Sequence, residues 1–336
     1  MRRGGPVVAL LCLTLACTSA PEPPAQTAAA PDTPAGSPGA PDRIAVWIDT
    51  DPSVMPGGHE VDDGLALIQA FHSPELDVRG VSAVFGNAEL ATTARIAEEI
   101  VDRFGPDRLQ AWPGADGAAR LGEQTEATRA LISALDQAPM TILALGPVTN
   151  VASVLLLRPE LRSQIQEIVV VAGRRPGDQF RVGTGGAPLR DLNFELDAPA
   201  MQVLLDSGVL LTLAPFEISS KVMLTGEHLA RLEAGGEAAR WLAGPVRDWL
   251  DRWRTSFGAS GFHPFDTLAV AYLTSPDWLT CEDVPSQIVT AQDDVEPGRE
   301  KPYFHVSADL RTSFIVRYCH DVDAAFTDDL LTRLVE

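Results

Sequence analysis

The sequence predicts an α/β fold with a mainly parallel central sheet flanked by helices. Short apolar runs alternate with longer segments of helical spacing from residue 43 onward, which is the pattern of successive β–α units joined by right-handed crossovers. Hydrophobic residues make up 45% of the 336 residues and charged residues 21%, so the chain has ample apolar material for a core. Residues 43–336 contain no internal repeat and no second linker, and we predict one domain there.

The predicted elements follow one another in a regular order. A buried strand at 43–48 precedes a helix at 61–71, on which Val61, Leu65 and Ile68 share one face. Ligands in such folds bind beyond the carboxyl ends of the strands, so the residues after each apolar run are candidates for a site. Further strands are predicted at 78–85, 141–145, 168–172 and 210–215, and further helices at 90–104, 123–137, after residue 150 and at 198–205.

The N-terminal segment indicates export. Two arginines precede an apolar run at 7–15, which is too short to span a bilayer and is typical of a signal sequence. Residues 14–17 (Thr-Leu-Ala-Cys) are similar to a lipobox, although Leu is usual at the first position. We expect a lipoprotein-type signal at 1–17 with Cys17 as the lipidation site, followed by a disordered Ala/Pro-rich tether at 18–42. A cleaved signal without lipid and an uncleaved anchor are the alternatives.

Charge and cysteine content narrow the partners and the compartment. The formal net charge of −20 makes the surface acidic, which disfavours nucleic acid and suits a protein that collects a cation. Membrane contact is expected only through the lipid anchor, in a periplasmic or cell-envelope protein. Cys281 and Cys319 remain after the signal. An oxidising compartment permits a disulfide between them, and two separate buried thiols are the alternative.

Five carboxylates fall within fifteen residues at the end of the first predicted strand: Asp49, Asp51, Glu60, Asp62 and Asp63. Strand alternation places Asp49 and Asp51 on one side, and the acidic pair at 62–63 opens the next helix. Closely placed carboxylates repel one another, and a bound cation would relieve that repulsion. Oxygen ligands without a His/Cys set favour calcium or magnesium over zinc.

Two other interpretations of this cluster exist. Asp62 and Asp63 are also typical of an ordinary helix N-terminus, and Asp51-Pro52 of a simple turn. Residues 49–53 also approximate the Asp-x-Asp-x-Thr motif of haloacid-dehalogenase-type phosphatases, in which Asp49 would be the nucleophile. The second acidic pair follows too soon for that fold.

Five motifs, in order, resemble those of the nucleoside hydrolase family, the inosine–uridine-preferring type. The first motif of that family, Asp-x-Asp-Pro-Gly-x-Asp-Asp, is split here by an insertion around residues 55–60. The resemblance spans about residues 43–330 and implies a nucleoside hydrolase-like α/β fold. The motifs are Asp49-Thr50-Asp51-Pro52 with Val61-Asp62-Asp63, Val84-Phe85-Gly86-Asn87, Gly146-Pro147-Val148-Thr149-Asn150, Asp191-Leu192-Asn193-Phe194 and Phe265-Asp266-Thr267-Leu268-Ala269.

The resemblance implies calcium-dependent hydrolysis of the N-glycosidic bond of a ribonucleoside to ribose and free base. Such a reaction develops oxocarbenium character on the ribose, which nearby carboxylates favour. Asp51 would be the general base and a Ca²⁺ ligand, with Asp63, Asp266 and the carbonyl of Leu145 as the other protein ligands. Ribose hydroxyls would be held by Asp62, Asn87, Asn193 and Asp191, the last standing where the family has Glu.

One position departs from the family pattern. Phe265 stands where many members have a His that helps to protonate the departing base. His263 is a candidate substitute, and Trp249 and Trp253, on a predicted helix, are candidates for stacking on the base. The missing His also leaves open a non-catalytic, tethered nucleoside- or riboside-binding protein. The resemblance further suggests a homo-oligomer.

Overall fold

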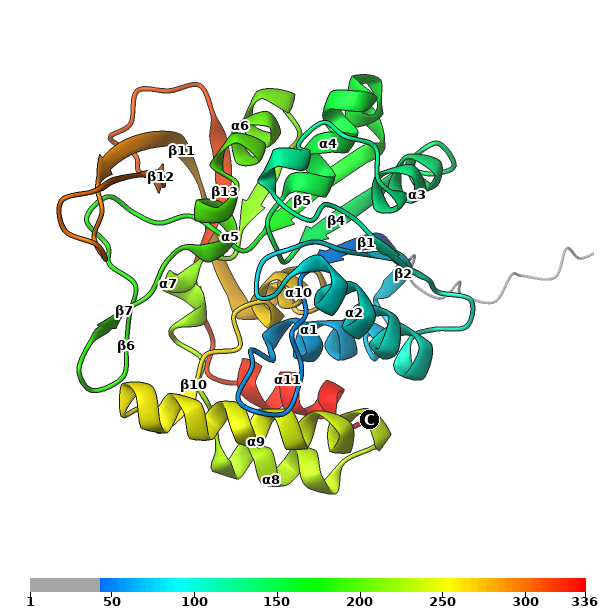
Figure 1. The fold of residues 1–336 in the computed structure, drawn as a ribbon, viewed down its shortest axis with the longest axis vertical. Helices are drawn as coiled ribbons and strands as arrows, with labels where there is room; N and C mark the ends of the chain where they lie inside the picture. Colours follow the sequence, from blue (N-terminus) through cyan, green and yellow to red (C-terminus); the bar gives the residue numbers. More distant parts are fainter. Residues whose placement is uncertain (1–42) are drawn as a thin grey trace, which may run out of the picture. The chain divides into compact units, whose positions relative to one another are not determined.

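The computed structural model describes residues 43–336, in which helices cover both faces of a nine-stranded sheet (Figure 1). The expected signal at 1–17, including Cys17, and the expected tether at 18–42 lie outside the described residues. Among the helices that are described, none is both long enough and apolar enough to cross a membrane.

The central part of the sheet is parallel, as predicted. Its strand order is β12-β11-β13-β8-β5-β4-β1-β2-β3, and every neighbouring pair from β13 to β3 is parallel. The strands of this parallel part are β1 (Ile44–Thr50), β2 (Leu76–Ala83), β3 (Ala111–Pro113), β4 (Met140–Ala144), β5 (Ile165–Val170), β8 (Leu211–Leu213) and β13 (Ile315–Val322).

Strand β1 is buried on both faces because it is central in the sheet. Val46 and Ile48 belong to the core on one face, and Trp47 belongs to the core on the other. This double burial explains why β1 is a continuous apolar run rather than an alternating one. The first face is covered by α1 (Asp62–Phe71), α2 (Leu90–Phe104), α10 (Thr267–Thr274) and α11 (Phe326–Leu334), and the second by α3 (Glu126–Leu135), α4 (Thr149–Leu157) and α6 (Ala198–Ser207).

Capping residues mark several helix ends. Thr125 accepts a hydrogen bond from the backbone N–H of Thr128 at 3.1 Å and so caps α3. The side chain of Asp197 caps α6 by accepting from the N–H of Ala200 at 3.1 Å. Gly208, which follows α6, has a φ of 73°, a left-handed conformation that glycine adopts without strain.

Helix α9 (Glu237–Phe257) is, with 21 residues, the longest helix within residues 43–336 and lies beside α8 (Gly226–Ala234) (Figure 1). Its buried face includes Leu242, Val246 and Trp253. The shorter elements are α5 (Leu192–Leu196), α7 (Phe216–Ser219), the 3-10 helices η1 (Ala118–Arg120), η2 (Pro159–Gln164) and η3 (Pro276–Trp278), and the strand pairs β6 (Arg181–Val182) with β7 (Ala187–Pro188) and β9 (Leu224–Thr225) with β10 (Gly261–Phe262).

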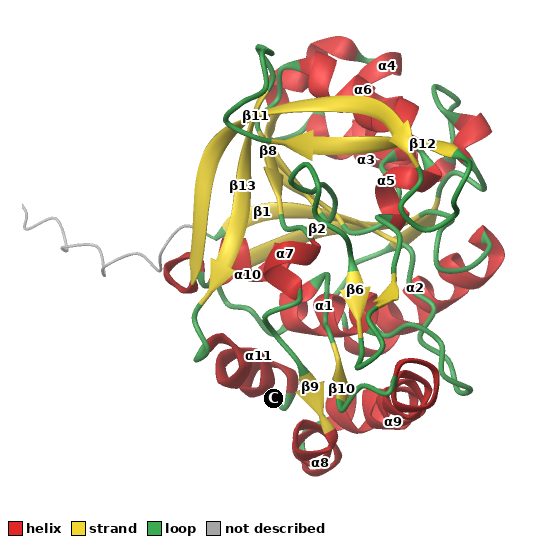
Figure 2. Ribbon diagram, turned by 90° about the vertical axis from the view of Figure 1, so that its left-hand side faces the viewer, coloured by secondary structure: helices red, strands yellow, loops and turns green. Residues whose placement is uncertain are grey.

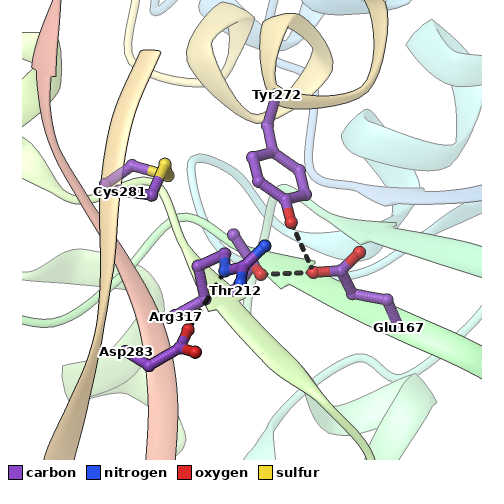
Figure 3. Close-up of a disulfide and its surroundings, with 7 residues drawn as sticks. Glu167, Thr212, Tyr272, Cys281, Asp283 and Arg317 are labelled. Atoms are coloured by element: carbon purple, nitrogen blue, oxygen red, sulfur yellow. Dashed lines mark hydrogen bonds and ion pairs between the residues drawn. A yellow bond between two sulfur atoms is a disulfide. The ribbon is translucent and has the colours of Figure 1, made fainter. Parts of the chain in front are cut away.

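The C-terminal strands add an antiparallel part for which the sequence analysis named no elements. β11 (Leu279–Gln292) pairs antiparallel with both β12 (Glu300–Val306) and β13 (Figure 2). Cys281 of β11 and Cys319 of β13 lie opposite each other and form a disulfide (Figure 3). The same two strands are also joined by an ion pair, in which Nε of Arg317 lies 3.1 Å from Oδ1 of Asp283. Of the two alternatives for the cysteines, the structure therefore shows the disulfide.

Candidate active site

A cavity of about 320 Å³ lies where several parallel strands end. Asn87 follows β2, Leu145 follows β4, Val171 follows β5 and Phe216 follows β8, and all four line the cavity. The volume falls within the range of small-molecule sites. The cavity has two unlike ends. We call the first the carboxylate end (Glu60, Asp62, Asn87, Asp191, Asn193 and Asp266, with buried Asp51 and Asp63 against them) and the second the aromatic end (Phe180, Phe216, Trp249, Trp253, Phe257 and Phe265).

Asp51 is held directly after β1 by backbone and side-chain contacts. Its Oδ2 accepts a hydrogen bond from the N–H of Asn87 at 2.6 Å. The N–H of Asp51 donates to Oδ1 of Asp63 at 3.0 Å, and the Thr50 hydroxyl donates to the same oxygen. Oδ1 of Asp51 is buried and has no hydrogen-bond partner among residues 43–336. One carboxylate oxygen is therefore oriented while the other is left unpaired.

Two glycines allow the backbone to approach Asp51 this closely. A Cβ atom at Gly86 would lie 1.9 Å from Oδ2 of Asp51, and one at Gly146 would lie 2.6 Å from Oδ1. Any larger residue at either position would collide with the carboxylate. Both glycines belong to motifs that carry the family resemblance, so their physical role is to leave room for Asp51.

Glu60 joins the carboxylate end from the insertion at 55–60. Asn87 donates through Nδ2 to Oε2 of Glu60 and to Oδ2 of Asp63, at 3.0 Å each. A carboxylate oxygen of Glu60, one of Asp62 and one of Asp63 lie within 4.8 Å of one another. Glu60 is one of the five clustered carboxylates of the sequence but had no predicted role, because the insertion has no counterpart in the family pattern.

Burial dominates the electrostatics of these acids. Removal from water raises the pKa of Asp63 to about 6, and burial together with the charge of Asp63 holds the pKa of Asp51 well above its usual range. Burial and neighbouring carboxylates likewise raise the pKa values of Asp62 and Asp266, and the Asp266 carboxyl is hydrogen bonded to that of Asp63. Oxygen ligands, mutual repulsion and unpaired buried oxygens together fit a divalent cation of the calcium or magnesium type.

Asp191 and Asn193 enter the site from α5 and the residue before it. Asp191 accepts a hydrogen bond from the N–H of Gly173 at 2.9 Å, and burial raises its pKa to about 6. Asn193 donates through Nδ2 to the carbonyl oxygen of Leu145 at 2.5 Å and to that of Val171 at 3.3 Å. The Leu145 carbonyl, the expected backbone ligand, is thus fixed beside an expected ribose contact.

Asp49 has a different environment from Asp51, although both leave the same strand. Its Oδ1 accepts hydrogen bonds from Ser82 at 2.5 Å and from Asn150 at 2.8 Å. Burial raises its pKa to about 7. Asp49 is not among the described residues that line the cavity, and its contacts tie β1 to β2 and α4. This placement is that of a supporting residue and not of an attacking nucleophile.

The aromatic end is built by side chains from separated segments. The rings of Phe180 and Phe216 stack with centroids 4.6 Å apart, and Phe216 stacks with Phe265 at 6.0 Å. Trp249 and Trp253 come from α9 and meet edge to face at 6.2 Å. The indole Nε1 of Trp253 is buried and has no hydrogen-bond partner in the described part of the chain. The two tryptophans were predicted from the sequence, whereas Phe180, Phe216 and Phe257 were not.

His263 is packed against this end rather than lining it. Its ring meets those of Trp253 at 5.5 Å and Phe265 at 6.1 Å, both edge to face. Its Nδ1 lies 2.7 Å from the carbonyl oxygen of Val222, and burial lowers its pKa. Since Nδ1 must carry a proton to donate to that carbonyl, Nε2 of the neutral ring has none to give.

Known proteins share both the sequence pattern and this architecture. Ribonucleoside hydrolase RihC of Shigella flexneri, described as non-specific, is 26% identical over 265 residues, covering 71% of this chain and 81% of that protein. The pyrimidine-specific ribonucleoside hydrolase RihB of Escherichia coli O1:K1 is also 26% identical over 265 residues, covering 70% of this chain and 80% of that protein.

Solved structures agree on the fold. The plant nucleoside hydrolase PpNRh1 superposes with a TM-score of 0.72 at 21% identity, covering 88% of this chain and 99% of that one. A purine-preferring ribonucleoside hydrolase from Gardnerella vaginalis gives a TM-score of 0.68 at 20% identity, with 87% and 98% covered. The family model for inosine-uridine preferring nucleoside hydrolases matches residues 46–326. This chain therefore belongs to the inosine-uridine preferring nucleoside hydrolase family.

Proposed function

We propose that this protein hydrolyses the N-glycosidic bond of a ribonucleoside to ribose and free base, with calcium bound and Asp51 activating the attacking water. Family membership makes the chain a hydrolase of N-glycosyl bonds. The observation that carries the finer proposal is one cavity with a carboxylate end, suited to a ribose, and an aromatic end, suited to a planar base.

The carboxylate end supplies contacts for the sugar. Asp62, Asn87, Asp191 and Asn193 line the cavity and present carboxylate and amide groups that hydrogen bond to ribose hydroxyls. The negative charge of the Asp62 and Asp191 carboxylates also favours the oxocarbenium character that develops as the glycosidic bond breaks. Holding the sugar by several hydroxyls orients its anomeric carbon toward Asp51.

Asp51 has the properties of a general base. Its buried Oδ1 accepts no hydrogen bond from residues 43–336, so one lone pair can face the cation while the other takes a proton from the attacking water. Asp51, Asp63, Asp266 and the Leu145 carbonyl would hold the calcium ion. When bound, calcium neutralises the clustered carboxylates and lowers the pKa of nearby water.

The aromatic end receives the leaving base. Trp249 and Trp253 offer ring faces and edges to a planar heterocycle, and Phe265, which replaces the family His, adds another ring. The unpaired indole N–H of Trp253 is a donor that can hydrogen bond to a ring nitrogen or oxygen of the departing base. His263 supports these rings by packing against them.

We also propose that the protein works outside the cytoplasm, in the periplasm or cell envelope, with Cys17 as its lipid-anchor site. The lipobox-like residues 14–17 motivate this proposal. The disulfide between Cys281 and Cys319 supports it, because such bonds persist in oxidising compartments and are rare in the cytosol.

Ribose release from a panel of purine and pyrimidine nucleosides, with and without a calcium chelator, tests the proposal. We expect release with calcium and its loss after chelation. Calorimetry with the same nucleosides distinguishes a binding protein, which would bind without consuming them. A folded, calcium-saturated protein that releases ribose from no nucleoside would overturn the proposed activity.

A further inference from the structure

The insertion at 55–60 is docked on helix α9. The N–H of Gly57 donates to Oδ2 of Asp248 at 2.8 Å, and Arg252 donates through Nη1 to the carbonyl oxygen of Gly58 at 3.3 Å. Gly58 has a φ of 77° and lies so close to α9 that an added Cβ would be 3.2 Å from Cβ of Arg252. The insertion is therefore held against α9 by specific contacts, and this loop positions Glu60 in the site.

Both carboxylate oxygens of Glu60 are directed at members of the site. Oε2 accepts from Nδ2 of Asn87 at 3.0 Å, and Oε1 accepts from the backbone N–H of Asp62. Glu60 also lines the cavity. Each oxygen keeps a second lone pair, so these contacts orient the carboxylate without exhausting its capacity to bind a cation.

Two buried carboxylate oxygens of the carboxylate end have the chemistry of cation ligands. Oδ1 of Asp62 and Oδ1 of Asp51 have no hydrogen-bond partner among residues 43–336, and both side chains are at least 95% buried. Leaving a buried carboxylate oxygen unpaired is costly, and a cation is the partner that would remove the cost at both positions. Ligand oxygens of Glu60, Asp62 and Asp63 are already within 4.8 Å of one another.

We infer that Glu60 is an additional cation-binding residue of this site, a carboxylate supplied by the insertion that acts with Asp62 and Asp63. This inference rests on the calcium requirement of the proposed function. Calcium accepts about 6–8 oxygen ligands, and the number of charged ligands tunes its affinity. The insertion thus strengthens cation binding and, through its seat on α9, ties the carboxylate end to the helix that carries Trp249 and Trp253.

The test compares Glu60→Gln with the matched control Glu89→Gln. Glutamine at position 60 keeps the length and an acceptor oxygen but removes the charge. Glu89 is exposed and lies two residues after Asn87, so its replacement removes the same charge from the surface nearby. Calcium affinity is measured by calorimetry on the full chain. The melting temperature of the same protein is measured with and without calcium.

We expect Glu60→Gln to weaken calcium binding by about tenfold or more, since loss of one charged ligand changes affinity on that scale. The calcium-free variant should melt higher than the wild type, because one repelling charge is gone, and should gain less from calcium. A merely structural role for Glu60 would lower the melting temperature instead. Glu89→Gln should leave both quantities unchanged.

The outcomes separate this inference from the proposed function. If the wild type binds calcium and Glu60→Gln binds it equally well, the role of Glu60 is overturned and the calcium-dependent nucleosidase stands. If the wild type binds no calcium at all, both the calcium requirement and the role of Glu60 are overturned. Ribose release measured on the same samples shows whether nucleosidase activity survives in that case.

Discussion

The two ends of the cavity are built from different parts of the chain. The carboxylate end comes from residues that follow β1 and β2, from the insertion at 55–60, and from the starts of α1, α5 and α10. The aromatic end comes from the loop before β6, from the first residue of α7, from one face of α9 and from the loop before α10. The ends of strands and the starts of helices therefore position most of the carboxylate end, whereas packing between segments distant in the sequence positions the aromatic end.

The difference has an energetic side. The carboxylate end concentrates acids whose burial, together with their mutual repulsion, raises the pKa values of Asp51, Asp62 and Asp266 and destabilises the calcium-free fold. The aromatic end contributes favourable apolar burial and ring contacts. The carboxylate end therefore lowers the stability of the calcium-free fold while it supplies the groups proposed for the reaction. The aromatic end both stabilises the fold and is proposed to bind the base.

Asp51→Asn should have the largest effect and should act on the carboxylate end alone. Loss of a general base lowers kcat by roughly 10²–10⁴-fold, and we expect about a thousandfold here. The same change removes a repelling charge, so the calcium-free variant should melt higher than the wild type. Steady-state ribose release and thermal unfolding measure the two effects.

Asp77→Asn is the control for this change. Asp77 pairs with Arg79 at the surface of β2, so its substitution alters the net charge equally but leaves the cavity untouched. It should leave kcat within about twofold, as surface substitutions usually do. Retention of more than a tenth of wild-type activity by Asp51→Asn would contradict the role of Asp51 as base.

The pH dependence of stability is the next largest effect. Burial raises the pKa of Asp49 from 3.8 to about 7 and that of Asp63 to about 6, so the folded state holds these protons longer than the unfolded state. Their stabilising contribution is complete below about pH 4 and is lost as pH rises through 6 to 7. The calcium-free protein should therefore be less stable at pH 7.5 than at pH 5, by roughly 3 kcal/mol.

Thermal or urea unfolding at pH 5 and at pH 7.5 measures how the stability of the calcium-free protein depends on pH. Asp191, whose pKa burial also raises to about 6, adds to this pH dependence. His228, His263 and His305 oppose it, because burial lowers their pKa values and their contribution to stability rises with pH. Asp49→Asn should reduce the slope, and saturating calcium should reduce it further by neutralising the other acids. A calcium-free protein as stable at pH 7.5 as at pH 5 would show that the carboxylate end is not under electrostatic strain.

The same comparison explains how much the sequence could predict. The mainly parallel sheet follows from alternating apolar runs, and Asn87 and Leu145 stand at the ends of predicted strands. Asp266 was expected only because its motif resembles that of the nucleoside hydrolase family. Phe180 and Phe216 carry no local signal, because only packing between remote segments brings them together. Trp249 and Trp253 were expected because the helix that carries them lies where the resembled family builds its base pocket; helical spacing alone predicts only core packing. The hairpin of β11 and β12 was missed because the sequence analysis followed β–α alternation, which ends before it.

Trp253→Phe sharpens the aromatic side of the comparison. The substitution keeps a ring but removes the unpaired indole N–H. A hydrogen bond to a charged group contributes about 1.5–3 kcal/mol, so loss of the bond to a departing base should lower kcat by about tenfold or more. A 4-nitrophenyl riboside, whose phenolate leaves without help, should be hydrolysed at close to the wild-type rate.

Trp241→Phe provides the matched control on the same helix. Trp241 packs against Phe104 with ring centroids 5.5 Å apart and is not among the described residues lining the cavity. Trp241→Phe should change the rate of hydrolysis of neither the nucleoside nor the nitrophenyl riboside. Equal losses on the nucleoside and on the nitrophenyl riboside for Trp253→Phe would indicate that the ring positions the substrate and that its N–H does not assist departure.

His263→Asn should have the smallest effect, and it decides whether the aromatic end hides an acid. Asparagine can replace Nδ1 as the donor to the Val222 carbonyl while removing Nε2. Because the lowered pKa keeps the ring neutral with its proton on Nδ1, no proton transfer is lost, and kcat should change by less than about threefold, well below the 10²-fold loss typical of a missing acid. A loss near 10²-fold, together with a vanished basic limb of the pH–rate profile, would place the leaving-group acid at His263. Both ends of the cavity would then take part in proton transfer. They would differ only in the segments of the chain that build them.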